Sequence, residues 1–270
     1  MEKKILTSVL SSTKNPTIKQ VRKLHRHKER QQQNLLLLEG NNIITTAVNL
    51  NYPLVTVFCT PKWQNFHQQL LREITERGHK IQLVSQEVLA SIATTVSPDG
   101  VVATAARQTA QTPVISQTKL GLAVERLQDP GNLGTIIRTA VATGVDGLWL
   151  SHDSVDFDHP KLLRASVGEW FRLPMATTPD LSSIVQQHQQ QQIQVIATVP
   201  NANKTYWELD LTRPSLLLIG NESAGLSPQL QDLADEKISI PLYNEVESLN
   251  VAIATALILY EAKRQNHSLF

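Results

Sequence analysis

Three segments of the chain place small and polar residues directly after runs of apolar residues. They are "QDPGNLGTIIRTA" (128–140), "LLLIGNESAGLS" (216–227) and "SIPLYNEVESLNVAIA" (239–254). Backbone amides and short polar side chains bind polar ligands at the carboxyl edge of open α/β sheets. The first segment also carries Arg138, a fixed cation suited to a phosphate or to developing negative charge. The three segments together predict one ligand site.

Each segment taken alone also fits a simpler explanation. Its glycines fit tight turns, and Ser248 fits the N-cap of the helix that follows it. The glycines of the first segment match neither the dinucleotide fingerprint G-x-G-x-x-G nor a phosphate-binding loop ending in Gly-Lys-Ser/Thr. A nicotinamide-dependent oxidoreductase would therefore lack its usual cofactor signature.

The residues around these segments predict the elements that position them. In the second half, apolar runs predict strands at 120–127, 145–150, 193–199, 215–220 and 237–242. A helix is predicted after Pro130, closed by Gly144, and a nearly all-apolar helix is predicted at 248–265. Strands that alternate with helices indicate a parallel sheet.

The first half shows the same alternation on a smaller scale. A basic helix is predicted at 15–31, and strands follow at 35–40, 54–59, 80–85 and 100–106. This pattern predicts a small α/β unit with a largely parallel sheet. A polar stretch with Pro113 separates the halves, so we predict domains at 1–106 and 119–270 joined by a linker at 107–118.

Charge is concentrated at the N-terminus. Residues 1–30 contain nine Lys or Arg against two Glu, whereas the whole chain has a net charge of only +1. Such density is typical of a polyanion-binding surface, although a solvated basic helix has the same composition.

The composition argues against a disulfide-bonded, secreted or membrane-spanning protein. Cys59 is the only cysteine, which excludes an intrachain disulfide. The sequence shows neither a signal peptide nor an apolar run long enough to span a membrane. We expect a cytoplasmic protein without a membrane partner, and we assign no metal site.

The three segments, in their order and spacing over residues 118–265, resemble the motifs of the SpoU (TrmH) family of RNA 2′-O-ribose methyltransferases in the SPOUT superfamily. The first 105 residues are similar to the small RNA-binding domain, like certain ribosomal proteins, that precedes the catalytic domain in larger members. The resemblance implies an α/β fold class: a C-terminal parallel sheet with a deep trefoil knot, preceded by a small α/β RNA-binding domain.

The resemblance also implies S-adenosylmethionine as the cofactor, held in the knot mainly by backbone groups and apolar packing. The positions that match the family's cofactor contacts are Gly220, Asn221, Ile240 and Leu249. The family commonly carries glycine where this chain has Asn244, and asparagine tolerates the left-handed backbone that such a position requires.

The same resemblance implies the residues on the substrate side. Asn132 would structure the site and Arg138 would face the ribose and its phosphate. Because a guanidinium stays protonated, we do not expect Arg138 to act as the base. We expect it to orient the ribose and its phosphate and to stabilise negative charge. Glu222 is the candidate proton acceptor, with Ser248 and Asn250 as hydrogen-bonding partners.

The implied partners are RNA and a second copy of the chain. Ribosomal RNA, most simply that of the large subunit, is favoured over transfer RNA. The basic residues assigned to RNA are Lys14, Lys19, Arg22, Lys23 and Arg26. A homodimer would form through the C-terminal domain. In the segment 158–174, Arg164, Ser166 and Phe171 are further candidates for RNA or dimer contact. A non-catalytic RNA-binding or ribosome-assembly factor that keeps the fold is the alternative from another class.

Overall fold

The structure is a computed structural model that describes residues 5–108 and 112–266, with only the backbone of residues 5–7. Its contacts divide the chain into two units. The first comprises Met1–Thr109 and Asp156–Phe171, and the second comprises Ala110–Val155 and Arg172–Phe270. Segment 156–171 therefore packs within the first unit, although it falls inside the predicted range 119–270. Residues 109–111 of the predicted linker lie outside the described residues, and the domain boundaries remain a prediction.

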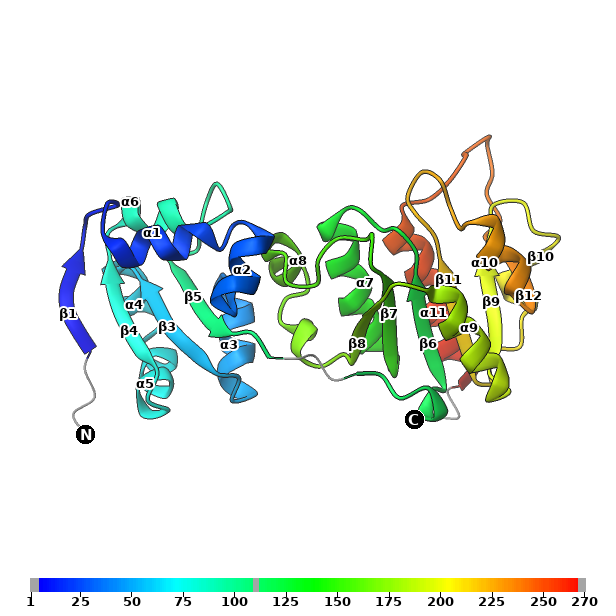
Figure 1. Cartoon of the computed structure of the whole chain (residues 1–270), viewed down its shortest axis with the longest axis horizontal. Coiled ribbons are helices and arrows are strands. Elements are labelled where there is room, and N and C mark those ends of the chain that lie inside the picture. The colour runs from blue at the N-terminus through cyan, green and yellow to red at the C-terminus, as the bar shows by residue number, and fades with distance from the viewer. Residues whose placement is uncertain (1–4, 109–111, 267–270) are drawn as a thin grey trace. The chain divides into compact units, whose positions relative to one another are not determined.

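The first unit contains a five-stranded mixed sheet (Figure 1). Its strands, in spatial order, are β1 (Ile5–Leu10), β4 (Lys80–Val84), β3 (Leu54–Cys59), β5 (Val101–Ala106) and β2 (Leu35–Glu39). β5 runs antiparallel to both of its neighbours, so the prediction of a largely parallel sheet is wrong here. The helix α6 (Gln86–Ile92) and residues 93–100 connect β4 to β5, which starts from the edge of the sheet where β4 ends.

Helices cover the two faces of this sheet. Their bounds are α1 (Pro16–Lys23), α2 (His27–Gln33), α3 (Asn41–Asn49), α4 (Pro61–Phe66) and α5 (Gln68–Glu76). α1 and α6 share one buried cluster with the sheet, in which Ile18, Val21 and Leu24 supply the apolar side of α1. The predicted single helix at 15–31 is wrong, because the backbone becomes extended at Arg26 and a second helix begins there.

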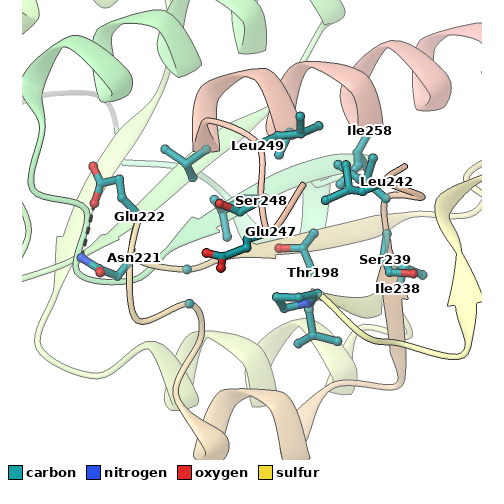
Figure 2. Close-up of a pocket in the computed structure, with 18 of the residues that line it drawn as sticks. Thr198, Asn221, Glu222, Ile238, Ser239, Leu242, Glu247, Ser248, Leu249 and Ile258 are labelled. Carbon is teal, nitrogen blue, oxygen red and sulfur yellow. Dashed lines mark hydrogen bonds between the residues drawn. The ribbon is translucent and has the colours of Figure 1, made fainter. Parts of the chain in front are cut away.

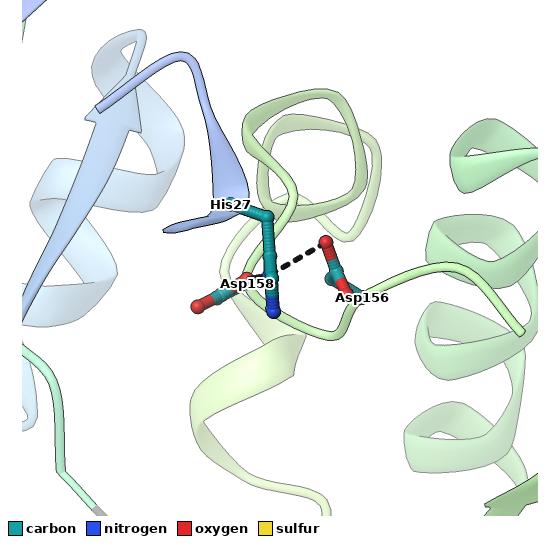
Figure 3. Close-up of side chains that lie close together, drawn as sticks. All are labelled: His27, Asp156 and Asp158. Atoms are coloured by element: carbon teal, nitrogen blue, oxygen red, sulfur yellow. Dashed lines mark ion pairs between the residues drawn. The ribbon is translucent and has the colours of Figure 1, made fainter. Parts of the chain in front are cut away.

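Ion pairs hold segment 156–171 within the first unit. The buried Arg30 side chain binds Asp158 at 3.1 Å, and Arg107 binds the same carboxylate at 3.0 Å. Figure 3 shows His27 facing Asp156, with 2.7 Å between Nδ1 and Oδ2. Two guanidinium groups and one imidazole thus surround two carboxylates in a single network.

The remainder of that segment packs on β2 and α3. It forms α8 (Pro160–Ala165) and a 3₁₀ turn at Glu169–Phe171. Arg164 pairs at 2.7 Å with the buried carboxylate of Glu39. Ser166 is buried, and Phe171 contacts the ring of Tyr52 at a centroid distance of 4.6 Å. Within the first unit these side chains therefore serve packing.

The second unit contains a seven-stranded sheet in which all paired strands are parallel. In spatial order the strands are β10 (Lys204–Thr205), β12 (Glu236–Ser239), β9 (Gln194–Thr198), β11 (Ser215–Ile219), β6 (Leu120–Val124), β7 (Gly147–Ser151) and β8 (Met175–Thr178). The strand β11 is buried at every position, as its unbroken apolar sequence predicts. The loops after β6, β9, β11 and β12 therefore emerge at one edge.

Helices lie on both faces of this sheet (Figure 1). They are α7 (Pro130–Thr143), α9 (Leu181–Gln190), α10 (Pro228–Leu233) and α11 (Val251–Asn266), with 3₁₀ turns at Ile115–Gln117 and Tyr206–Glu208. α7 packs against α11, whereas α9 and α10 share a buried cluster with Trp149, Leu216 and Leu218. Among the described residues, no helix has the length and apolarity required to cross a bilayer.

Candidate active site

The first segment begins α7 and does not form a free loop. Asp129 is the N-cap, and its side chain accepts a 2.9 Å hydrogen bond from the backbone amide of Asn132. Pro130 occupies the first helical position. Gly131 therefore lies inside the helix, and the simpler explanation that the glycines of this segment form a tight turn is wrong. The predicted closure at Gly144 is confirmed by its left-handed φ of 82°.

The second segment folds tightly after β11. Asn221 and Gly225 exchange backbone hydrogen bonds of 3.1 and 3.0 Å. At Gly220, a Cβ atom would lie 2.2 Å from the Gly225 carbonyl carbon, so only glycine fits this position. The Asn221 Nδ2 donates at 2.7 Å to the Arg126 carbonyl oxygen and thereby joins this loop to the one after β6.

Glu222 is the hub between these two loops. Its carboxylate accepts hydrogen bonds from the backbone amides of Gln128 and Asp129 at 3.3 and 3.1 Å and from Asn132 Nδ2 at 3.2 Å. Burial acts to raise the pKa of Glu222, but these hydrogen bonds and one to its own backbone outweigh burial and hold the pKa below its ordinary value. The carboxylate is therefore ionised at neutral pH.

The third segment joins the same network through Asn250. Its Oδ1 accepts from the amide of Ala252 at 2.9 Å, and its Nδ2 donates to Asn132 Oδ1 at 2.9 Å. Asn250 therefore caps α11, and the alternative that assigned the cap to Ser248 is wrong. The chain Asn250–Asn132–Glu222 connects all three segments that the sequence placed at one edge.

The loop between β12 and α11 requires unusual backbone geometry. Asn244 has a φ of 57° and Glu245 a φ of 59°, both in the left-handed region. Asparagine adopts this region more readily than most residues with a side chain. Asn244 thus supplies the conformation that the family's glycine would provide.

These loops enclose a cavity of about 340 Å³ at the carboxyl edge of the sheet (Figure 2). Six residues named from the sequence line it: Gly220, Asn221, Glu222, Ile240, Ser248 and Leu249. Asn132 and Asn250 are outside the lining and hold its walls through Glu222. Most of the remaining lining is apolar, with Leu242, Val251 and Ile258 among the contributors.

One wall of the cavity was missed in the sequence. This wall consists of Thr198, the last residue of β9, and of Val199 and Pro200, which follow it. The strand β9 was predicted, and in a parallel sheet its carboxyl end lies at the same edge as that of β11. The same edge rule could therefore have found these residues.

Arg138 occupies a different position. It is exposed on α7 and is absent from the cavity lining. No hydrogen bond or ion pair connects its guanidinium to another residue within the described ranges. Its charge is available to an external partner.

The predicted RNA-binding residues lie in the first unit. All five are exposed, on α1 or within three residues of it: Lys14, Lys19, Arg22, Lys23 and Arg26. The Arg22 guanidinium is fixed by bonds to the carbonyl oxygens of Ser91 and Thr13, at 3.1 and 3.3 Å. The buried residues of the helix are Ile18 and Val21, so the basic side chains point away from the core.

Comparisons with known proteins identify the family to which both units belong. Residues 119–260 match the SpoU rRNA methylase family, and residues 15–103 match an MRM3-like substrate-binding domain. A tRNA/rRNA methyltransferase of Synechocystis, itself uncharacterised, is 44% identical over 95% of this chain and 93% of its own. The 23S rRNA (guanosine(2553)-2′-O)-methyltransferase RlmP of Bacillus subtilis is 30% identical over 94% of this chain and 98% of its own.

A solved structure supports the cofactor. The AdoMet-bound rRNA methyltransferase from Sinorhizobium meliloti superposes with a TM-score of 0.82, at 31% identity over 97% of this chain and 99% of its own. The cavity suits this ligand, because its apolar side chains fit an adenine ring and the ionisable residues in the described part of its lining, Glu222 and Glu247, are both acidic and suit a cation. The chain therefore belongs to the SpoU (TrmH) family and is an S-adenosylmethionine-dependent RNA 2′-O-ribose methyltransferase.

Proposed function

We propose that the substrate is ribosomal RNA of the large subunit. The Bacillus subtilis relative, which acts on 23S rRNA by name, matches along both units and not along the catalytic part alone. A substrate-binding domain match covers most of the first unit. A two-unit chain suits a large folded RNA, in which several structural elements are presented together. The proposal also places the enzyme in the cytoplasm, where that RNA is assembled.

The second part of the proposal assigns the residues of the reaction. The cofactor supplies an electrophilic methyl group, which the ribose 2′-oxygen must approach in line from about 3 Å. Gly220, Asn221, Ile240 and Leu249 hold the cofactor, and these four residues line the cavity. Arg138 grips the neighbouring phosphate and stabilises negative charge on the attacking oxygen. Its exposure and its lack of a described partner support this role.

Glu222, Asn132 and Asn250 form the frame of the site. The lowered pKa of Glu222 and the donors on its carboxylate favour a positioning role over proton acceptance. Ser248 lines the cavity and offers its hydroxyl to the reacting groups. The hydrogen-bonded chain through Asn132 keeps the three loops in one arrangement before the RNA arrives.

The basic side of α1 binds the RNA backbone. Lys14, Lys19, Arg22, Lys23 and Arg26 provide sequence-independent affinity, as phosphate contacts generally do. Recognition of one nucleotide must then come from the shape of the RNA around it.

We further propose a homodimer through the second unit and a deep trefoil knot around the cofactor. An apolar stripe on α11 supports the dimer: Ile253, Leu257 and Tyr260 are 55%, 38% and 56% exposed. The spacing of these residues places them on one face of the helix. The convergence of the loops after β11 and β12 on one cavity supports the knot.

The observation that carries the proposal is the hydrogen-bonded junction of three loops around a cavity that suits the cofactor. Ribose methylation mapped across all RNA of a deletion strain tests it. One methylation should be lost from large-subunit rRNA and restored by the wild-type chain but not by Arg138→Ala. Loss of a methylation from transfer RNA alone would contradict the ribosomal assignment. Failure of the purified protein to bind S-adenosylmethionine would favour a non-catalytic assembly factor.

A further inference from the structure

The cavity contains one charged side chain that the frame of the site does not use. Its two ionisable lining residues are Glu222 and Glu247. Glu222 is held by several hydrogen-bond donors. Glu247 forms no hydrogen bond or ion pair with any residue that the structure describes. Figure 2 shows its carboxylate turned toward the middle of the ring of lining residues, beside Ser248 and opposite Thr198.

The surroundings make this carboxylate a site for positive charge. Among the residues that the structure describes, no Lys, Arg or His lines the cavity, so no described cation in its wall neutralises Glu247. Apolar side chains such as Leu242 and Leu249 border the same space. Glu247 is itself exposed in the structure, so solvent screens its charge when no ligand is bound. A ligand that fills this space displaces part of that water and strengthens the attraction between the carboxylate and a cationic ligand.

The reaction changes the charge of the ligand. Methyl transfer breaks a sulfur–methyl bond as an oxygen–methyl bond forms, and the 2′-hydroxyl proton is released to water or a base. The sulfonium donor thereby becomes a neutral thioether, S-adenosylhomocysteine. Donor and product share the adenosine and amino-acid parts, so contacts to those parts affect both ligands alike. A carboxylate near the sulfur can distinguish them.

We propose that Glu247 raises the affinity of the cavity for the sulfonium donor relative to the thioether product, an inference that rests on the methyltransferase function. Loss of the positive charge in each turnover removes one favourable interaction of the bound ligand. The product then leaves more readily, and fresh donor competes better for the site. Glu247 is a specificity-determining residue for the cofactor, separate from the residues assigned to the RNA.

Binding of three ligands, measured by isothermal titration calorimetry, tests this inference without RNA. Glu247→Gln keeps the shape of the side chain and removes its charge. We expect its affinity for S-adenosylmethionine to fall by about five- to tenfold, from the loss of one partly screened charge interaction, and its affinity for S-adenosylhomocysteine to stay unchanged. Sinefungin, which carries an amine in place of the sulfonium methyl, should follow the donor.

Two further variants make the result specific. Glu247→Asp keeps the charge and should keep the wild-type preference. Glu245→Gln is the matched control, because Glu245 is exposed in the same loop but does not line the cavity. It should leave all three affinities unchanged.

Two results would overturn the inference. Equal loss of donor and product affinity in Glu247→Gln would place the carboxylate on a part that both ligands share. Unchanged affinities would show that it does not contact the ligand. Both differ from failure of the wild-type protein to bind S-adenosylmethionine, which would contradict the function itself.

Discussion

The Nδ2 atom of Asn250 donates a 2.9 Å hydrogen bond to Oδ1 of Asn132 and so joins the start of α11 to the first turn of α7. The other end of the Asn250 amide caps α11, with a 2.9 Å bond from the Ala252 amide. One side chain thus performs a local task and a long-range task with different atoms. The two tasks can be separated by mutation.

Asn250→Asp should separate them. It keeps the oxygen that caps the helix but replaces the donor to Asn132 with a carboxylate oxygen. We expect a melting temperature near that of the wild type and a methyl-transfer rate at least about tenfold lower, because a group that positions the site is removed. Asn250→Ala should lose both tasks and cost about 1 kcal/mol of stability.

Ser227→Ala is the control for this pair. Ser227 caps α10 with its own hydroxyl and does not line the cavity. It should lose stability but retain activity. A wild-type rate in Asn250→Asp would show that the bond to Asn132 has no role in the reaction.

Glu222→Gln should change the pH dependence of stability. The folded pKa of Glu222 lies below its ordinary value of 4.5, so its ionised form stabilises the fold above that pH. This contribution is lost as the pH falls from 4.5 through the folded pKa. At pH 7 we expect Glu222→Gln to lower the free energy of unfolding by about 1 kcal/mol, because partial exposure weakens its charged hydrogen bonds.

Urea unfolding at several pH values measures this effect. The difference between wild type and Glu222→Gln should shrink as the pH falls below 4.5, while Glu245→Gln should match the wild type throughout. A difference that stays constant down to pH 3 would mean that the ionised carboxylate does not account for it.

Neutralising the basic face of α1 should weaken RNA binding without unfolding the protein. The variant Lys19→Gln, Lys23→Gln, Arg26→Gln leaves Arg22 in place, because Arg22 is bonded to two carbonyl oxygens of the fold. The slope of log affinity against log salt should decrease by about 0.7 to 0.9 for each phosphate that the variant no longer neutralises. Filter binding to an rRNA fragment over a salt series measures it.

A double variant at Arg72 and Lys80, both exposed elsewhere on the first unit, serves as the control. Its two residues are replaced by glutamine in the same way. The control removes two charges where the test variant removes three, so a control decrease of about two-thirds the size would mean that binding follows total charge and not the face of α1.

Tyr260→Asp should produce a monomer. Tyr260 is 56% exposed on the apolar stripe of α11, so a carboxylate there opposes burial in an interface but leaves the monomer fold intact. Light scattering coupled to size-exclusion chromatography measures the mass. Phe66→Asp, at a site 76% exposed in the first unit, should remain a dimer. A dimeric Tyr260→Asp would exclude this stripe as the interface.

The sequence predicted the central strands of the second unit well because these strands are buried at almost every position and most of their residues are apolar. The ends of β9 and β11 lie within one residue of the predicted ends. β6 begins at the predicted residue but ends three residues before the predicted end. The rule that parallel strands share a carboxyl edge then placed the three polar segments together from the sequence alone. This rule depends on strand order only weakly, which explains its success.

The wrong predictions concern places where local signals compete. Ser248 and Asn250 are both good capping residues, and only the path of the loop decides that Asn250 caps α11. β5 reverses direction after a glycine turn at Gly100, with a φ of 98°, which hydropathy does not reveal. The partners of segment 156–171 in the rest of the first unit are more than fifty residues away in the chain, as in Arg107–Asp158 and Arg30–Asp158. Periodicity carries no information on such pairs.

We propose that Arg138 contacts the RNA and takes no part in binding the cofactor. The whole mechanism depends on this division of roles between Arg138 and the residues of the cavity. Single-turnover methyl transfer by Arg138→Ala, with saturating S-adenosylmethionine, tests the division. Thr135→Ala, on the same exposed face of α7, is the control. We expect Arg138→Ala to keep its cofactor affinity and to react more slowly by about a hundredfold or more, whereas a near wild-type rate in this variant would contradict the proposed role.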